Sequence, residues 1–483
     1  MTQRERNEAF AAIALLVILT PVALQPIYSY DFFWHLSAGR WIAEHGALPL
    51  TDPFAVASDR TPWINGEWLF QVLLYGLHTI GGVAAAAWSR AVLVAAIFAA
   101  NFFFAGRVTG ASIAFLLASL AFAGGCARID ARPGTVAAAL LVGAIVLLST
   151  KSRWATVAYV ALTIVWINTH PSALLAPFIA GAVAVFERDR RDAWITAIGS
   201  ALALLVNPFG IHGVLAPLQL TAFVGSGAFV NAEWLPSPLR IFPILYLTVA
   251  VGGIAFATAR ARRDQLWRFA VFALLAWLSL AHVRNQGLYF AAFPILISPM
   301  VRREISHRAL VVVAIIPIAW MAIRFDHSAS LATRRFPIAS VARLKQTRLF
   351  GNIYNPDQFG GYLIWSFYPE RRALTDGRNE LYHQFIAEYA KARLDSRAWR
   401  ALLKKYRIEL AVDEYRGPIE SVDAMTGGRR AIPASLAYFP RREWALVGYD
   451  DVSMVFARRA SFPQALLDRW EITGVVPDAT RAP

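Results

Sequence analysis

Long apolar runs separated by short polar stretches cover the first two thirds of the chain. They lie at about 9–27, 86–106, 110–126, 135–150, 154–168, 172–186, 192–206, 241–258, 267–281, 287–300 and 309–323. A transmembrane helix needs about 20 consecutive, mainly apolar residues, and an ordinary soluble core cannot hide so many runs of this kind. The pattern therefore predicts an α-helical polytopic membrane protein.

Composition agrees with this interpretation. Of the 483 residues, 57% are hydrophobic and 16% are charged, whereas soluble domains carry about 25% charged residues. The formal net charge of +15 is not accompanied by any nucleic-acid-binding signature, so anionic lipid is the better partner. Cys126 is the only cysteine, which excludes an intramolecular disulfide.

Orientation depends on the stretch from Glu67 to Gly82, which is apolar but contains Gln71 and His78. If it lies in the membrane interface, the basic clusters between later spans fall on the cytoplasmic side, as the positive-inside rule requires. These clusters are Arg107; Lys151 and Arg153; Arg188, Arg190 and Arg191; Arg260, Arg262, Arg263 and Arg268; and Arg302, Arg303 and Arg308. We therefore predict an interfacial helix and about eleven spans, with the C-terminus outside.

The N-terminus carries Arg4 and Arg6 ahead of the first apolar run. That run is long and no small-residue cleavage site follows it, which favours an uncleaved first span with a cytoplasmic N-terminus.

With this topology, the polar residues at the opposite ends of the spans all fall on the extracytoplasmic face. They are Asp31, His35, Glu67, Arg128, Asp130, Arg132, Asn168, His170, Asn207, Glu233, His282, Arg284 and Asn285. Anchoring in lipid does not require such a collection. The extracytoplasmic face is therefore the candidate site.

The first outer loop, residues 28–66, places Asp31 four residues before His35, on one face of a helix. Two carboxylates, Asp31 near the start of the loop and Glu67 directly after it, are suited to deprotonating a hydroxyl and orienting a charged donor. Structural roles are equally compatible with the spacing, because Asp31 can cap a helix and Glu67 can favour a helix N-terminus. His35 is a third candidate catalytic residue beside these two carboxylates. Packing at the interface explains this histidine better than metal ligation does, since no tight ligand cluster accompanies it.

Several short motifs resemble those of bacterial GT-C-fold glycosyltransferases, which include protein O-mannosyltransferases and lipid A aminoarabinose transferases. The first-loop motifs are Asp31-Phe-Phe-Trp-His35-Leu-x-x-Gly39-x-Trp, Leu48-Pro-x-x-Asp52-Pro-Phe and Trp63-Ile-x-x-Glu67-Trp-Leu. Further matches are Trp166-x-Asn168-x-His170, Asn207-Pro-Phe-Gly210, Glu233-Trp, Arg284-Asn285 and the stretch Asn355 to Tyr382. The resemblance implies transfer of a sugar from a polyprenyl-phosphate carrier to an extracytoplasmic acceptor, with Asp31 as general base and Glu67 as a second acidic residue. The Asp-Asp or Asp-Glu pair that some branches have after the first span is absent here.

Such a transfer needs cationic groups that hold the phosphate leaving group. Arg128, Arg132 and Arg284, with His282 nearby in sequence, are the candidates, because arginine binds phosphate oxygens in a planar, bidentate manner. Snorkelling to anionic headgroups is the alternative for each arginine. Asp130 is a candidate ion-pair partner for the arginines that flank it.

Three further residues at span ends, Asn168, His170 and Asn207, are candidates for orienting substrate, although capping explains the asparagines nearly as well. The proline- and glycine-containing segment 214–239, with Glu233, is predicted to be a partly ordered outer loop that closes over the carrier.

From residue 324 the composition becomes that of a soluble domain. We expect a transmembrane GT-C-like domain at 1–323 and an extracytoplasmic α/β domain at 324–483. In the second, strands are predicted at 349–354, 372–375, 409–413, 444–449 and 454–457, and helices at 379–393 and 396–406. FGGYLIW at 359–365 precedes Thr375-Asp376-Gly377-Arg378-Asn379. We interpret this segment as a turn stabilised by an Asp–Arg pair; the alternative is that Arg378 projects toward a phosphate or a sugar.

No P-loop or GxGxxG motif occurs, so no nucleotide cofactor is expected; the need for a divalent cation is left open. The leading hypothesis is a glycosyltransferase of the bacterial inner membrane that uses a polyprenyl-phosphate-linked sugar and a glycan, lipid or protein acceptor. The alternatives are a lipid-linked substrate transporter or flippase, which would need charges at mid-depth in the spans, and a non-catalytic membrane receptor.

Overall fold

The computed structural model describes residues 3–128, 130–150, 152, 154–187, 190–227, 231–259, 265–301, 308–422 and 429–479. Of the basic clusters that set the predicted orientation, several members lie outside the described residues: Lys151, Arg153, Arg188, Arg260, Arg262, Arg263, Arg302 and Arg303. Two compact units form, the first from residues 1–29 and 64–331 and the second from residues 30–63 and 332–483.

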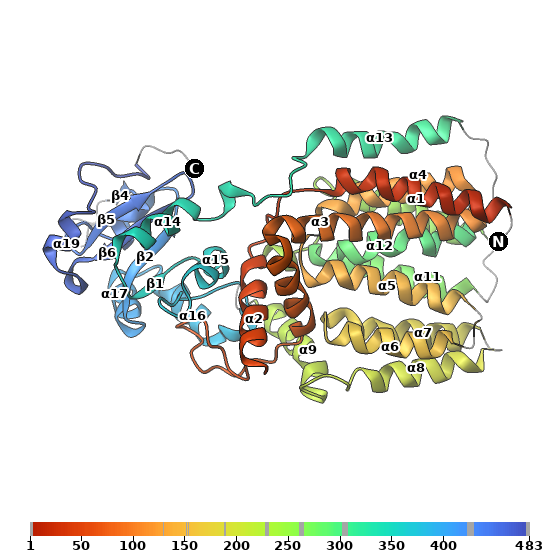
Figure 1. Ribbon diagram of the computed structural model, residues 1–483, viewed down its shortest axis with the longest axis horizontal. Helices are drawn as coiled ribbons and strands as arrows, with labels where there is room; N and C mark the ends of the chain where they lie inside the picture. Colours follow the sequence, from red (N-terminus) through yellow and green to blue (C-terminus); the bar gives the residue numbers. More distant parts are fainter. Residues whose placement is uncertain are drawn as a thin grey trace. The chain divides into compact units, whose positions relative to one another are not determined.

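The first unit is a bundle of α-helices (Figure 1). Its helices are α1 (Gln3–Ala23), α3 (Trp68–Thr109), α4 (Ala111–Gly125), α5 (Pro133–Ser149), α6 (Ala155–Ile167), α7 (Leu175–Phe186), α8 (Arg191–Ala203), α9 (Ile211–Gly225), α10 (Pro243–Thr258), α11 (Leu266–Ala281), α12 (Gln286–Ile297) and α13 (Arg308–Arg324). Every predicted apolar run coincides with one of these helices. The segment 214–239, predicted to be a partly ordered outer loop, is helical in its first part, because residues 214–225 belong to α9.

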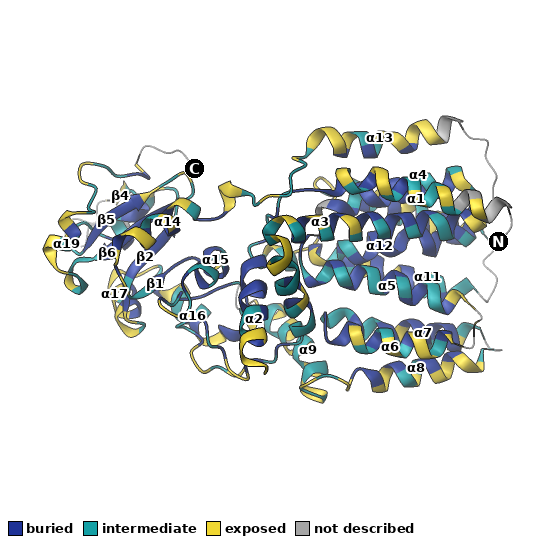
Figure 2. Ribbon diagram, viewed as in Figure 1, coloured by how far each residue is buried: buried dark blue, intermediate teal, exposed yellow. Residues whose placement is uncertain are grey.

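Apolar side chains fill the interior of this bundle and also remain exposed on its outer helices (Figure 2). Among the described residues, the helix Trp68–Thr109 is long and apolar enough to cross a membrane, and the other apolar helices have 10–17 residues. Exposed large apolar side chains include Phe10, Ile80, Ile254 and Ile323. Extensive apolar exposure of this kind marks surfaces that contact lipid or protein.

Helix α3 is interrupted at Gly81 and Gly82, whose backbone angles are not helical. Gly82 has φ 62° and ψ −151°, a combination that only glycine adopts readily. The segment before the kink runs across the ends of the bundle helices (Figure 1). Residues 68–80 thus form a helix distinct from the run at 86–106, in agreement with the division made from the sequence.

The second unit contains a four-stranded sheet in the order β1-β2-β6-β5. The strands are β1 (Asn352–Tyr354), β2 (Ile408–Glu414), β5 (Trp444–Tyr449) and β6 (Ser453–Arg458). In a separate two-stranded sheet, β3 (Ile419–Val422) pairs antiparallel with β4 (Arg429–Ile432). Strand β1 pairs parallel with β2, and the remaining pairs of the sheet are antiparallel. Four of the five predicted strands are present; residues 372–375 instead make isolated bridges through Ala373.

Helices cover this sheet. They are α14 (Ile338–Thr347), α15 (Asp357–Phe367), α16 (His383–Ala392), α17 (Ser396–Lys405), α18 (Ala434–Tyr438) and α19 (Gln464–Asp468). The predicted helices at 379–393 and 396–406 correspond to α16 and α17. Asp395 caps α17 by accepting hydrogen bonds from the N–H groups of Arg397 and Ala398, which satisfies two donors that a helix start leaves unpaired.

The first outer loop is part of this second unit. It forms α2 (Phe32–His45), and the strand-like segment after it pairs with the tail through hydrogen bonds from the N–H groups of Val56 and Ala57 to the carbonyls of Ala373 and Leu374. Phe54 and Trp63 lie in the same apolar core as the sheet. The boundary predicted at residue 323 places this loop with the membrane helices, whereas the structure places residues 30–63 with the tail.

Candidate functional site

Asp31 lies at the N-terminal boundary of α2, and its side chain makes no capping hydrogen bond. Its Oδ1 instead accepts a hydrogen bond of 3.1 Å from Nε1 of Trp34. The side chain is half-buried. Helix capping, the structural alternative for this carboxylate, is therefore not its role here.

His35, four residues after Asp31, is buried. Its ring packs against that of Trp34, with ring centroids 3.6 Å apart. This contact agrees with the packing role considered from the sequence. A catalytic role for His35 stays a prediction.

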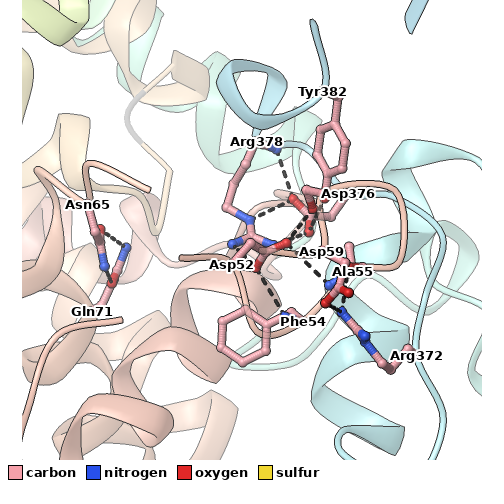
Figure 3. A network of polar contacts seen from close by, with 11 residues as sticks. Asp52, Phe54, Ala55, Asp59, Asn65, Gln71, Arg372, Asp376, Arg378 and Tyr382 are labelled. Atoms are coloured by element: carbon pink, nitrogen blue, oxygen red, sulfur yellow. Dashed lines mark hydrogen bonds and ion pairs between the residues drawn. The ribbon is translucent and has the colours of Figure 1, made fainter. Parts of the chain in front are cut away.

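A buried polar network in the same unit joins Arg378 to two aspartates (Figure 3). Nη1 of Arg378 is 2.9 Å from Oδ1 of Asp52, and Nε of Arg378 donates to Oδ1 of Asp376 over 2.8 Å. The hydroxyl of Tyr382 donates to Oδ2 of Asp376. Asp52 also accepts hydrogen bonds from the N–H groups of Phe54 and Ala55.

The charges in this network decide the protonation of Arg378. Burial by itself lowers the pKa of Arg378, but the two carboxylates of Asp376 and Asp52 raise it well above its ordinary value. Arg378 therefore stays charged. The Asp–Arg pair interpreted from the sequence as a structural turn is confirmed, and it includes a second aspartate from the first outer loop.

Other carboxylates surround Asp31 in this unit. Desolvation raises the pKa of Asp357, at the start of α15, and the negative charges of Asp31 and Asp376 raise it further. Glu380 has its pKa raised to about 7 by desolvation and by the same two carboxylates, against the opposing effect of Arg378. A negative neighbourhood of this kind favours proton uptake by the carboxylates in it.

In the first unit, the arginines named from the sequence converge on Glu233. Arg132 forms an ion pair with Glu233, and its Nε donates to Oγ of Ser29 over 2.6 Å. The guanidinium of Arg284 lies 4.5 Å from the ring centroid of Trp234, and that of Arg128 lies 5.0 Å from the ring centroid of Phe242. These cation–π contacts fix two of the three guanidinium groups.

Glu233 is the counter-ion of this group. Burial by itself raises the pKa of Glu233, but Arg132, followed by Arg284 and Arg128, outweighs that effect and holds the pKa below its ordinary value. Asp130, considered from the sequence as the partner of the arginines, instead accepts a hydrogen bond from the N–H of Ala131. The ionic partner of Arg132 is therefore Glu233.

His282 and His170 also belong to this end of the bundle. Nδ1 of His282 lies 2.7 Å from the carbonyl oxygen of Trp234, and the two rings are in edge contact. Nδ1 of His170 accepts a hydrogen bond from the N–H of Ser172. Burial, together with the positive charge of Arg284, lowers the pKa of His170 to about 3, so His170 is neutral at physiological pH.

The side chains of Asn168 and Asn207 make hydrogen bonds to other groups of the protein. Asn168 accepts a hydrogen bond from Nε1 of Trp68 and donates to the carbonyls of Ile164 and Val206. Asn207 accepts from the N–H of Phe209 and donates to the carbonyls of Leu204 and Gly210. Both therefore stabilise the ends of helices, and substrate orientation by either stays a prediction.

Glu67 immediately precedes α3 and makes no side-chain capping hydrogen bond. The turn before it is held by Asn65 and Gln71, whose side-chain amides exchange hydrogen bonds of 2.7 and 2.9 Å (Figure 3). Within the described residues, no group of three or more histidine, cysteine or acidic side chains is placed to hold a metal ion.

Sequence reasoning missed the role of Glu233 as an arginine partner and the links from Asp52 to the tail. Glu233 was recognised only as a polar residue of an outer loop, because its partner is 101 residues away. The Asp52-Pro53 turn signal was visible, but a turn signal does not identify the residue to which the turn is attached.

Comparison with solved structures identifies the fold. The model superposes on ArnT from Cupriavidus metallidurans with a TM-score of 0.60 and 14% identity, over 94% of this chain and 98% of that one. ArnT bound to undecaprenyl phosphate gives a TM-score of 0.58 and 13% identity over the same shares.

The archaeal oligosaccharyltransferase AglB from Archaeoglobus fulgidus, solved with an inhibitory peptide and a dolichol-phosphate, gives a TM-score of 0.58 and 11% identity over 88% of this chain and 74% of that one. No family model and no curated protein matches the sequence. The chain thus has the fold of these solved structures, the GT-C fold that the resemblance of its motifs implied.

Proposed function

We propose that this protein is a membrane glycosyltransferase that moves a sugar from a polyprenyl-phosphate carrier to an extracytoplasmic acceptor, with Asp31 as the general base. The observation that carries the proposal is the GT-C fold, which extends over 94% of the chain and is shared with an ArnT structure that holds undecaprenyl phosphate. The carboxylate of Asp31 adds to it, because this half-buried side chain makes no capping hydrogen bond to its helix.

The reaction that we assign has two parts. The acceptor's nucleophilic atom attacks the anomeric carbon while Asp31 takes its proton, and the bond from that carbon to the phosphate oxygen breaks. The released polyprenyl phosphate carries the negative charge away. Positive groups that stabilise this charge as it develops lower the barrier.

Arg132, Arg284 and Arg128 are the groups that we assign to the phosphate. Their support is their convergence on one carboxylate, Glu233, which has the same charge sign as the proposed ligand. Two of the guanidinium groups lie on aromatic rings, which restricts their motion before a ligand arrives. We propose that His282 orients the carbonyl of Trp234 beside them, and that Asn168, His170 and Asn207 shape the same end of the bundle.

The location follows from the same proposal. A carrier with a long apolar tail requires an enzyme in the membrane, and the exposed apolar helices of the first unit provide a surface for lipid. We propose a multi-pass protein of a bacterial inner membrane, with about eleven spans, a cytoplasmic N-terminus and an extracytoplasmic C-terminal domain. The acceptor is a glycan, lipid or protein.

The test is transfer of radiolabelled sugar from a panel of polyprenyl-phosphate sugars in proteoliposomes. Asp31→Asn should reduce the transfer rate by about 100- to 10,000-fold, the usual contribution of a general base. Ser37→Ala is a matched control on the same helix, since Ser37 only bonds the carbonyl of Phe33. Full transfer by a folded Asp31→Asn protein would exclude Asp31 as the base.

Glu67→Gln tests the second acidic residue in the same assay. We expect a smaller loss than for Asp31→Asn, and a rise in KM for the donor, if Glu67 orients substrate without exchanging a proton. A wild-type protein that bound undecaprenyl phosphate but transferred no sugar would favour the transporter or receptor alternatives.

A further inference from the structure

The main chain of the tail comes close to the carboxylate of Asp31 at one glycine, Gly377. A Cβ atom built on Gly377 would lie 2.6 Å from Oδ1 of Asp31 and 3.7 Å from Nε1 of Trp34. Real Cβ atoms do not approach oxygen so closely. Gly377 is not among the residues with positive φ, so its backbone conformation would accept alanine. The added methyl group would, however, have to push the carboxylate of Asp31 aside.

Two more glycines of the tail hold the backbone on either side of this contact. A Cβ on Gly361 would lie 3.0 Å from both the carbonyl oxygen of Tyr30 and the N–H nitrogen of Trp34. A Cβ on Gly360 would lie 1.9 Å from the carbonyl oxygen of Thr375. Helix α15 therefore packs without side chains against both the start of α2 and the turn that contains Gly377.

The turn is itself anchored. Arg378 binds Asp376 within the turn and Asp52 in the first outer loop, and all three side chains are buried. The main chain at Gly377 therefore has little freedom to move away from Asp31. Within this unit, Asp31 interacts electrostatically with Asp357 at the start of α15 and with Glu380 three residues after Gly377.

We infer that Trp34 and Gly377 are positioning residues for the general base: the indole N–H and the bare main chain of the tail together fix the direction of the Asp31 carboxylate. The inference rests on the proposed function and gives the C-terminal unit a part in it. The tail thus holds the reactive group in place. Misplacement of a reacting group by about 1 Å can cost 100-fold in rate.

The test uses the full chain in proteoliposomes with the variants Trp34→Phe and Gly377→Ala. Trp470→Phe is the control for losing an indole N–H elsewhere in the tail, and Gly253→Ala is the control for adding a methyl group where nothing lies within 4 Å. Two quantities are measured: sugar transfer, and the pH midpoint of carbodiimide-driven amine coupling to Asp31, quantified by peptide mass spectrometry.

Both variants should lower kcat by roughly 10- to 100-fold with the donor KM unchanged. The coupling midpoint at Asp31 should move to higher pH in both, because the hydrogen bond from Trp34 stabilises the charged carboxylate. Since both changes disturb the same bond, the double variant should shift the midpoint no further than the larger single variant. Both controls should behave as wild type.

Wild-type coupling midpoints in both variants would overturn the inference, whatever the transfer rates. If Gly377→Ala fails to fold, Trp34→Phe alone decides. If the wild type transfers no sugar from any carrier, the proposed function fails, and the coupling midpoints still decide whether Trp34 and Gly377 position Asp31.

Discussion

Arg378 and Asp52 form a completely buried ion pair, although 326 residues separate them in the sequence. The guanidinium also binds Asp376 and lies 4.6 Å from the ring centroid of Trp63. Arg378, a residue of the tail, thus contacts the first outer loop at two points, Asp52 and Trp63. The loop that carries Asp31 is part of a folded domain for this reason.

Arg378→Met should destabilise the second unit strongly. The substitution keeps the size of the side chain but leaves the buried carboxylates of Asp52 and Asp376 without their cation, and loss of one partner of a buried pair costs about 3–5 kcal/mol. We expect a lower melting temperature of the purified protein and faster proteolysis within residues 46–60.

The control for that substitution is Lys405→Met, which removes an exposed ion pair with Glu388. Exposed pairs contribute about 0–1 kcal/mol, so this variant should melt close to wild type. Equal melting temperatures for the two variants would mean that the buried network does not stabilise the fold.

The sequence predicted the parts of this network but not their connection. The Asp52 turn and the Asp376–Arg378 pair are local signals, readable from residues two or three apart. Their association is a tertiary contact, and a single sequence has no periodicity that records it. The apolar runs, in contrast, repeat over 15–20 residues, and each of them is a helix in the structure.

In the candidate site, too, some residues could be predicted from the sequence and others could not. Arg128, Arg132 and Arg284 were found because span ends and charge are both visible in the sequence. Gly377 was recognised only as part of a turn, because the reason for its small size is the carboxylate of Asp31, which belongs to a distant segment.

Arg132→Gln should weaken binding of undecaprenyl phosphate. Hydrogen bonds to charged groups contribute about 1.5–3 kcal/mol, which corresponds to a Kd roughly 10- to 100-fold higher. The measurement is binding of radiolabelled undecaprenyl phosphate to the purified protein in detergent. Arg107→Gln, at the other end of α3 from Glu67, is the control and should leave the Kd unchanged; a Kd that rises equally in both variants would point to a general effect of charge.

Glu233→Gln should have the opposite effect on the same Kd. Glu233 already neutralises Arg132, so a phosphate must displace this carboxylate before it can bind. Removing the charge should tighten binding by a few-fold to about tenfold, within the range of one ion pair. Weaker binding by this variant would show that Glu233 holds Arg132 in place and does not compete with the ligand.

The pH dependence of that competition has a definite sign. The arginines hold the pKa of Glu233 below its ordinary value, so the carboxylate is charged, and competes, throughout the neutral range. Wild-type affinity should therefore rise only as pH falls below the ordinary range of a glutamate, whereas Glu233→Gln should show no such rise. A wild-type profile that matches the variant over the whole range would contradict the assignment.

His170 should make the folded protein sensitive to mild acid. Its pKa is lowered to about 3 by burial and by Arg284, and its Nδ1 accepts the N–H of Ser172, so the folded state does not take up a proton there. Below pH 6.5 the unfolded chain does, and stability falls by up to about 1.4 kcal/mol per pH unit until the folded-state pKa is reached. His170→Gln should melt at a lower temperature than wild type at pH 7.5, because the bond to Ser172 changes, but should lose less further stability between pH 7.5 and 5. Equal slopes in wild type and His170→Gln would show that His170 titrates as freely in the folded state as in the unfolded one.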